Sequence, residues 1–436
     1  MPRLINRSNH ITSLSLLACL LSSFLFTTAH AAGYTPDEVV DARTSARVFD
    51  DAWETIHERY YDTAFNGADW QKLRGELRPL ALRAQNRNEL YRVLRRLTSA
   101  LADSHTRLFA PGESDDWRRT RFTEAGVRLV EADGSLFVAS VNEKSSAQRA
   151  GVRRGDEVIS IDNRPWRELL LAQTSDAAGA STPRIKRLRL VRHLLDGEAE
   201  TNVKLTIADP QGRTRIVSLT RTRGEFKPEL IITSLGNDAY RVAFNIFTEE
   251  IVATLARELR RGRLARAASL VIDLRANGGG ESEAMIDVLG IFLPPNENIG
   301  RFFDRAGRTT TVLRTRSAML SAAERGTSFR GSLILLTGTA TASAAEIFTA
   351  SLKRAHRPNT VVIGETTCGC VLAIRRRHRL PDGGTLDVSE LDYRTADELR
   401  LEGTGITPDE TVTPTRADIL ANRDPALTRA RQLTRK

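Results

Sequence analysis

Cysteine and lysine are both scarce in this sequence. Only three of the 436 residues are cysteine, which excludes a small fold built from disulfide bonds. Hydrophobic residues make up 41% and charged residues 27% of the chain, a balance that excludes collagen-like, disordered and polytopic membrane classes. The composition therefore predicts a soluble globular protein, and the length predicts two or three domains.

The positive charge comes almost entirely from arginine. Lysine and arginine total 64 against 54 acidic residues, a formal net charge of +10, and only 7 of the 64 are lysine. The arginines are scattered along the chain and are not gathered in the single stripe that is typical of a nucleic-acid-binding face. We therefore expect no nucleic-acid partner.

The first 31 residues have the pattern of a signal peptide. Arg3 and Arg7 precede an apolar run over residues 11–26, and Ala29-His30-Ala31 supplies a small-residue cleavage motif. The run is too short to predict a stable membrane span. We expect cleavage after this motif and export to a bacterial periplasm or to the medium. A lipid anchor through Cys19 is the alternative.

Four regions follow the signal peptide. Residues 36–112 carry apolar side chains at three- and four-residue spacing, which predicts helices without strands. Residues 113–225 read as short strands separated by turns. Residues 226–414 alternate strands with helices, which predicts an α/β layer. Residues 415–436 form a polar, arginine-rich tail that we expect to fray.

The strand-rich region contains a recognisable run. The stretch from Ala150 to Pro165, AGVRRGDEVISIDNRP, resembles the PDZ domain. That resemblance implies a C-terminal peptide laid beside a sheet edge, with its carboxylate held by backbone amides near Gly126 and Val127. A small β-rich spacer that binds nothing is the alternative interpretation.

Two segments of the α/β region offer a backbone setting for catalysis. Ser343 stands where a predicted strand leads into a predicted helix, against the positive end of that helix and its unpaired amides. Ser343 and Glu346 also fit a helix-capping box, so a structural role is the alternative. The run Asn277–Gly280 follows a buried strand, and its glycines either let amides approach a ligand or make a flexible turn.

Two further segments are informative only in combination. Asp103-Ser104-His105-Thr106 ends the helical region, and Glu402 lies in LEGTGITPD; each alone has an ordinary structural explanation. With VIDLRANGGG, SAAEI and the PDZ-like run, in this order, they resemble the tail-specific (carboxy-terminal processing) serine proteases. The resemblance implies an α/β protease core (ClpP/crotonase-like), no cofactor or metal, and polypeptide substrates recognised through their C-termini.

This family has two catalytic arrangements, and the sequence distinguishes between them. The Ser/Lys branch places its lysine where this chain has Cys370, at the end of GETTCGC. The tricorn-core-like branch has an adjacent Ser-His pair and a later glutamate, which Ser104-His105 and Glu402 match. The resemblance implies that neutral His105 takes the proton of the nucleophile Ser343, while Ser104 connects Glu402 to the ring. A catalytically inactive peptide-binding protein of the same fold is the rival reading, suggested by the missing lysine.

Backbone amides and two cysteines complete the predicted site. The oxyanion donors that the resemblance implies are the amides of Gly279 or Gly280 and of Ala344. Cys368 and Cys370 leave several alternatives open: a disulfide across one residue, which would be strained and easily reduced, a metal site that lacks two further ligands, or Cys370 as a nucleophile.

Overall fold

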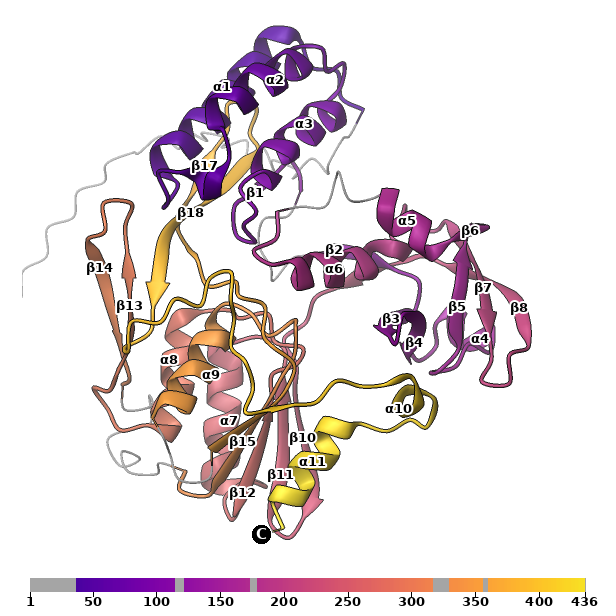
Figure 1. The fold of residues 1–436 in the computed structure, drawn as a ribbon, viewed down its shortest axis with the longest axis vertical. Helices are drawn as coiled ribbons and strands as arrows, with labels where there is room; N and C mark the ends of the chain where they lie inside the picture. Colours follow the sequence, from indigo (N-terminus) through magenta and orange to yellow (C-terminus); the bar gives the residue numbers. More distant parts are fainter. Residues whose placement is uncertain (1–36, 114–120, 173–178, 317–328, 356–359, 436) are drawn as a thin grey trace, which may run out of the picture.

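The structure is a computed structural model that describes residues 37–113, 121–172, 179–316, 329–355 and 360–435 (Figure 1). The predicted signal peptide and the alternative anchor Cys19 lie outside these residues. Within the described ranges, no helix is both long and apolar enough to cross a membrane.

Three helices make up the N-terminal region, as its apolar spacing predicts: α1 (Ala42–Arg59), α2 (Trp70–Leu82) and α3 (Arg87–Ser99). Each begins after a side chain that accepts a hydrogen bond from a first-turn amide: Asp41, Asp69 and Asn86. A short strand that the apolar spacing does not predict, β1 (Arg107–Phe109), pairs antiparallel with β18 (Thr385–Arg394). Leu386 and Val388 of β18 pack into the helical core, so this region shares its core with a distant part of the chain.

The second region is an antiparallel sheet in the order β3-β4-β5-β7-β8, with β6 paired to β5. Its strands are β3 (Val127–Ala132), β4 (Ser135–Val141), β5 (Glu157–Ile161), β6 (Arg164–Pro165), β7 (Asn202–Ala208) and β8 (Thr214–Thr220). Its helices are α4 (Ser146–Arg149), α5 (Trp166–Ala172) and α6 (Pro183–Arg192). Strands β2 (Arg121–Glu124) and β9 (Thr222–Glu225) pair where the chain enters and leaves the region. Strand β3 forms one edge of the sheet, and α6 packs beside it.

The third region is a six-stranded sheet in the order β10-β11-β12-β15-β16-β19. Its strands are β10 (Leu230–Gly236), β11 (Ala239–Phe244), β12 (Ser269–Asp273), β15 (Ser332–Thr337), β16 (Thr360–Gly364) and β19 (Glu410–Thr411). Strands β11 to β19 are parallel, and β10 is an antiparallel edge. The predicted α/β layer is therefore present.

Helices cover both faces of this sheet (Figure 1). One face is covered by α7 (Glu249–Arg261), α8 (Ser282–Phe292) and α9 (Ala344–Arg354). Leu270 and Ile272 of β12 point to this side, and Val271 points to the other. Successive residues of a strand face opposite sides, so a strand covered on both faces is apolar throughout.

An antiparallel arm joins the core to the helical region. It consists of β13 (Asn298–Phe303), β14 (Thr309–Arg314), β17 (Ala373–Arg379) and β18. Because β18 pairs with both β13 and β1, this arm holds the turn after α3 close to the core.

The C-terminal tail differs from its prediction. Residues expected to fray form α10 (Arg416–Leu420) and α11 (Pro425–Leu433). Ala426 and Ala430 of α11 are buried against the second face of the sheet, and Asp424 pairs with Arg275 at 2.8 Å. The small alanine side chains allow close packing, which explains why a segment of polar composition is ordered.

Candidate active site

Ser343 lies in the turn between β15 and α9. Its φ angle is 54°, a left-handed conformation that costs a non-glycine residue about 1–3 kcal/mol. A Cβ atom on Gly279 would lie only 2.7 Å from the Cβ of Ser343, so glycine is required for the two turns to approach this closely. The Ser343 side chain is half-buried at the start of the helix.

The glycine run beside Ser343 is organised by Asn277. The amide of Gly279 donates to Oδ1 of Asn277 at 2.8 Å, and the amide of Ala342 donates to the Asn277 carbonyl at 3.1 Å. The amide of Gly279, one of the predicted oxyanion donors, is therefore engaged within the turn in this conformation. The Gly280 amide is the alternative, with that of Ala344, since first-turn amides lack an acceptor within their helix.

The cysteine loop lies directly against Ser343. Cys368 and Cys370 form a disulfide, and both side chains are buried. The Ser343 amide donates to the Cys370 carbonyl at 2.9 Å. Lys353 is engaged elsewhere, since its ammonium pairs with Asp409 at 2.7 Å. The position of the lysine in the Ser/Lys branch is thus taken by half of a disulfide.

Glu346 holds this loop in place. Its Oε1 accepts hydrogen bonds from the Thr367 hydroxyl at 2.5 Å and the Gly369 amide at 2.7 Å. Its Oε2 accepts from the amides of Cys370 at 2.8 Å and Ser343 at 3.2 Å. Burial raises the pKa of this carboxyl group, and the four donors oppose that effect. The Glu346 part of the predicted capping box is therefore present, and it also links helix α9 to the cysteine loop.

The same residues form the only group in the described chain that approaches a metal-ligand cluster. A carboxylate oxygen of Glu346 and both cysteine sulfurs lie within 4.8 Å of one another. The sulfurs are bonded to each other, and each Glu346 oxygen already accepts two hydrogen bonds. A metal ion needs deprotonated thiolates and free oxygen lone pairs, so the arrangement does not fit one.

His105 lies in the turn between α3 and β1, and Asp103 shapes that turn. The Asp103 carboxylate accepts hydrogen bonds from the His105 amide at 2.6 Å and from the Ser389 hydroxyl on β18 at 2.9 Å. Nδ1 of His105 is buried and has no hydrogen-bond partner among the described residues. Burial lowers the pKa of His105 to about 4, although the charge of Asp103 acts in the opposite direction. The ring is therefore neutral at pH 7.

Ser104 and Glu402 are connected through Ser181, a residue that the sequence analysis did not select. The amides of Ser104 and Ser181 each donate to the hydroxyl of the other serine at 3.1 Å. The Ser181 hydroxyl lies near enough to the Glu402 carboxylate to lower its pKa, and the carboxylate accepts a hydrogen bond from the Val371 amide at 2.7 Å. The predicted direct bridge from Ser104 to Glu402 is thus replaced by a serine from the segment that precedes α6.

Charge on Glu402 is disfavoured in this setting. Burial raises the pKa of Glu402 to about 7, with smaller contributions from the charges of Asp103 and Glu346, while its hydrogen bonds lower it. Carboxylates whose pKa values are shifted this far toward neutrality are concentrated at functional sites.

Three of the predicted residues, Ser343, Ser104 and Glu402, are linked through contacts with their neighbours. A continuous set of contacts runs from Ser343 to Cys370, whose sulfur lies 3.3 Å from Oγ of Ser104, and then through Ser181 to Glu402. Among the described residues, no hydrogen bond joins the His105 ring to Ser343. Ser181 carries no local sequence signal, because it lies in a loop of the strand-rich region, far along the chain from either partner.

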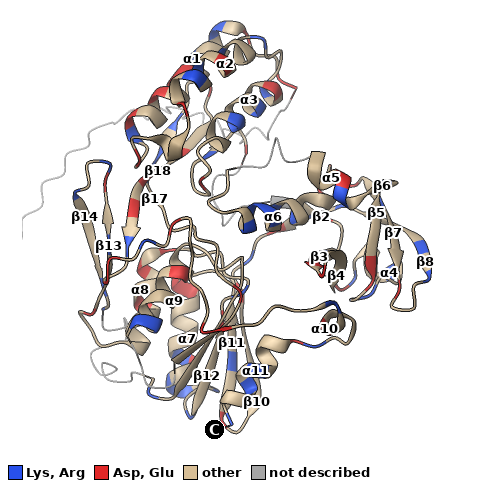
Figure 2. Cartoon of the chain, viewed as in Figure 1, with Lys and Arg blue, Asp and Glu red and all other residues tan. Residues whose placement is uncertain are grey.

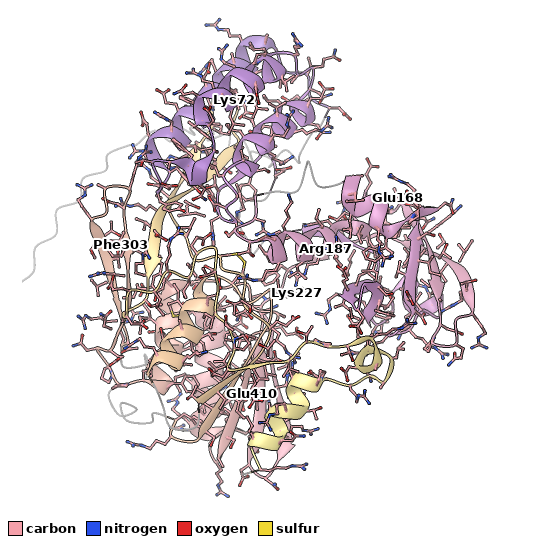
Figure 3. All side chains as sticks on the ribbon, in the orientation of Figure 1. Lys72, Glu168, Arg187, Lys227, Phe303 and Glu410 are labelled. Atoms are coloured by element: carbon pink, nitrogen blue, oxygen red, sulfur yellow. A yellow bond between two sulfur atoms is a disulfide. The ribbon has the colours of Figure 1, made fainter. Side chains whose placement is uncertain are left out.

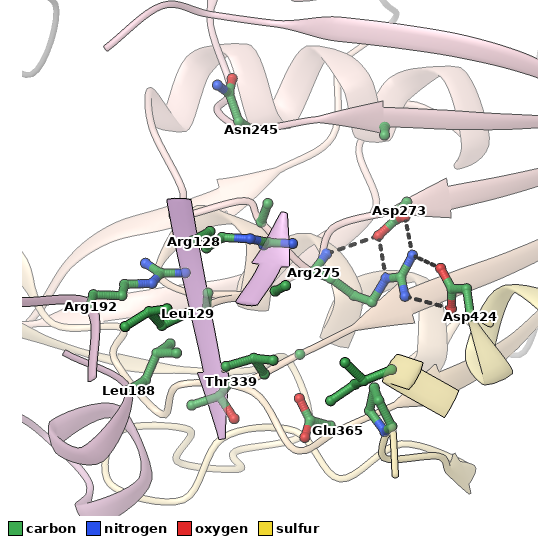
Figure 4. A pocket seen from close by; sticks show the side chains of 18 of the residues that line it. Arg128, Leu129, Leu188, Arg192, Asn245, Asp273, Arg275, Thr339, Glu365 and Asp424 are labelled. Carbon is green, nitrogen blue, oxygen red and sulfur yellow. Dashed lines mark hydrogen bonds and ion pairs between the residues drawn. The ribbon is translucent and has the colours of Figure 1, made fainter. Parts of the chain in front are cut away.

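A groove lies between β3 and α6 of the PDZ-like region. A cavity of about 730 Å³ opens there and reaches the protease core (Figure 4). Gly126, just before β3, has a φ of 76°, and a Cβ atom there would lie 2.5 Å from that of Ser145. The lining of the cavity begins at Arg128, one residue after Val127. The two predicted peptide-binding residues therefore lie beside one end of the groove.

Three family models match the chain in the order of these regions. The Tricorn protease C1 domain matches residues 42–99, the PDZ domain matches residues 119–182, and Peptidase family S41 matches residues 242–412. The matched segments correspond to the helical bundle, the PDZ-like sheet and the six-stranded core.

Known proteins show the same likeness. The chloroplastic C-terminal processing peptidase of Tetradesmus obliquus is 26% identical over 393 residues, covering 84% of this chain and 77% of that protein. The solved photosystem II D1 C-terminal processing protease has a TM-score of 0.54 at 22% identity, covering 85% and 94% of the two chains. Mature CPAF has a TM-score of 0.66 at 12% identity, covering 90% and 96%; these two likenesses concern the fold. With its domains in this order and a serine at the start of α9, the protein contains a peptidase family S41 domain over residues 242–412 and is similar over most of its length to the carboxyl-terminal processing proteases.

Proposed function

We propose that the protein is an exported serine endopeptidase that hydrolyses unstructured or C-terminally recognised polypeptides, with Ser343 as the nucleophile. The observation that carries this proposal is the backbone of Ser343, which keeps φ at 54° against Gly279 at the first turn of α9. The partial positive charge and free amides of a helix start stabilise developing negative charge in an acyl-transfer reaction. Backbone strain of this kind is concentrated at functional sites.

The general base in this proposal is His105, as in the tricorn-core-like branch of the family. Its pKa near 4 keeps the imidazole neutral and able to accept the Ser343 proton at pH 7. Neither lysine candidate supports the other branch, since Cys370 occupies one position and Lys353 pairs with Asp409. The match of residues 42–99 to the tricorn C1 domain favours the same branch.

We propose that Ser104, Ser181 and Glu402 together orient the His105 base. The reciprocal serine hydrogen bonds and the Ser181–Glu402 contact form one chain. Asp103 adds a second restraint, because it fixes the His105 backbone. In this proposal the His105 ring pairs with Ser343 when substrate binds, since catalytic hydrogen bonds often tighten only with substrate present.

The oxyanion is proposed to bind between two backbone amides. That of Ala344 begins α9, and that of Gly280 follows the turn that Asn277 organises. Donors fixed by a rigid backbone stabilise the tetrahedral intermediate without reorganising during the reaction.

Export is proposed from the N-terminal pattern of the sequence. The disulfide supports it, because disulfides persist in oxidising compartments outside the cytosol. The N-terminal residue of the mature protein distinguishes cleavage after Ala31 from lipid attachment at Cys19.

Labelling by a fluorophosphonate tests the peptidase proposal. We expect covalent modification of Ser343, located by mass spectrometry of the digested protein, and no modification of the Ser343→Ala variant. Labelling of the wild type at another serine contradicts the assignment of the nucleophile. No labelling, combined with tight binding of peptide C-termini, supports the catalytically inactive peptide-binding protein instead.

A further inference from the structure

The groove between β3 and α6 is rich in arginine. Eight arginines and five acidic residues line the cavity, and α6 itself contains five basic residues and no acidic one (Figure 2). Arg187 of α6, labelled in Figure 3, lies between the PDZ-like sheet and the core and pairs with Glu131 of β3 at 2.8 Å. The basic excess therefore lies on the wall that faces the edge strand.

Most of these arginines already have partners. Arg275 is held by Asp273 and Asp424 at 2.7 and 2.8 Å, and Arg241 also pairs with Asp273 at 2.7 Å. Arg184 donates from Nε to the Thr367 carbonyl at 2.6 Å. These side chains consequently contribute to the structure of the groove walls and are not free to bind a ligand.

Arg128 and Arg192 are the exceptions. No described carboxylate pairs with either guanidinium group, and the charges near them are those of other arginines. Both side chains are reached by water, yet the surrounding walls displace enough solvent to lower the pKa of each. Figure 4 shows the two side chains on the same side of the cavity, close to Leu129 and Leu188. Two neighbouring cations beside an apolar surface favour a ligand that has both a negatively charged group and an apolar group.

The groove has a direction. Arg192, at the C-terminal end of α6, and Arg128, at the start of β3, line the same side of the cavity (Figure 4). Arg184, at the other end of α6, contacts the loop that carries Cys368. A peptide along β3 with its C-terminus beside Arg128 would therefore extend toward the nucleophile.

We propose that this groove selects polypeptides whose C-terminus combines an apolar last residue with an acidic side chain close to it, through Arg128 and Arg192. The edge of β3 supplies backbone hydrogen bonds, and Leu129 and Leu188 contact the terminal apolar side chain. The two guanidinium groups pair with the terminal carboxylate and the acidic side chain, because Arg–carboxylate pairs are strong and geometrically specific. This inference rests on the proposed function, for which it names the substrate class.

Binding to the Ser343→Ala protein tests the proposal without hydrolysis. Fluorescence anisotropy is measured with eight-residue peptides that end in leucine and carry either two aspartates or two asparagines before it. We expect the aspartate peptide to bind about tenfold or more tightly in low salt, with the difference decreasing as salt is added. C-terminal amidation should weaken both peptides.

The matched variants are Arg128→Gln with Arg192→Gln, and the control Arg164→Gln on the exposed strand β6. The double variant should bind both peptides equally and weakly, whereas the control should keep the preference. The proposal is overturned if the two peptides bind with equal affinity to the protein that retains Arg128 and Arg192. This measurement does not depend on whether the double variant folds. Displacement of the aspartate peptide by inorganic phosphate at a similar concentration also overturns it, because the site would then bind any anion. If the peptidase proposal itself is wrong, fluorophosphonate will not label Ser343. That outcome is distinct from the result of the peptide-binding measurements.

Discussion

The amide of Ser343 donates a hydrogen bond to the carbonyl oxygen of Cys370, 2.9 Å away. The same amide also lies 3.2 Å from Oε2 of Glu346. The loop that carries lysine in one branch of the family is therefore a backbone support for Ser343 in this chain. Two supports act on this loop, the disulfide and the buried Glu346, and they can be separated experimentally.

The first prediction concerns the disulfide. Replacing both Cys368 and Cys370 with serine removes a very short covalent loop, whose constraint of the unfolded chain is worth about 1.5 kcal/mol. The hydrogen bonds to Glu346 remain, so we expect Tm to fall by a few degrees and kcat/KM by less than about tenfold. Thermal unfolding and peptide hydrolysis measure the two effects. Reducing agent should have the same effect on the wild type and none on the variant. A loss of activity by about a hundredfold or more would show that the disulfide itself sets the nucleophile.

The second prediction concerns the base. His105→Ala should lower kcat by roughly a thousandfold or more, as expected when a general base is removed. Tm should change little, because the buried Nδ1 has no described partner to lose. His193→Ala is the control, since that exposed ring pairs only with Asp196 among the described residues. Hydrolysis at the wild-type rate by the His105 variant would contradict the assignment.

The third prediction tests the connection through Ser181. Ser104→Ala, Ser181→Ala and Glu402→Gln should each reduce kcat/KM less than Ser343→Ala does, because orienting groups do not form the bond. If Ser181 joins the other two, the effects of Ser181→Ala and Glu402→Gln should be strongly non-additive. Kinetics of the double variant complete the cycle. Fully additive effects would mean that Glu402 acts independently of Ser181.

The fourth prediction concerns the pH dependence of activity. The pKa of Glu402 is raised to about 7, whereas that of His105 is lowered to about 4. If ionised Glu402 orients the base, kcat/KM should rise with pH through about 7. Glu402→Gln should lose this step and keep only the step near 4. A wild-type profile that is flat between pH 5 and 8, measured at steps of about half a unit, would exclude an ionisation of Glu402 in the reaction.

The fifth prediction concerns stability. Between its ordinary value near 4.5 and about 7, Glu402 is protonated in the folded state but ionised in the unfolded chain. The folded state therefore binds more protons, and its stability falls as pH rises through this window. Glu402→Gln removes the effect, so relative to the wild type it should gain about 3 kcal/mol of stability between pH 4 and pH 8. Urea unfolding at the two pH values provides the comparison, and a constant difference would contradict the raised pKa.

Much of the fold follows from local patterns. The apolar run of β12, covered on both faces, has the composition of a buried parallel strand. The spacing of apolar residues in α1 and α3 marks their buried faces. Family S41 was likewise recognisable from motifs around Ser343 and Glu402, because those motifs are contiguous in sequence.

The rest depended on contacts between residues far apart in the chain. Periodicity did not show that β1 would pair with β18, or that α11 would cover the second face of the core sheet. Ser181 joined Ser104 to Glu402 only once the PDZ-like region had packed against the core.

The arginines also show which properties follow from the sequence and which follow from the tertiary structure. Arginine is spread along the whole sequence, and that scatter argued against a nucleic-acid-binding stripe. Folding places Arg128 and Arg192, 64 residues apart in the numbering, on the same side of one groove with no carboxylate partner among the described residues. Composition and local periodicity thus indicated most of the helices and strands and their order, and the contiguous motifs indicated the family. Which charges remain unpaired, and where they meet, was decided by the tertiary structure, because electrostatic interaction depends on distance in space and not on separation along the chain.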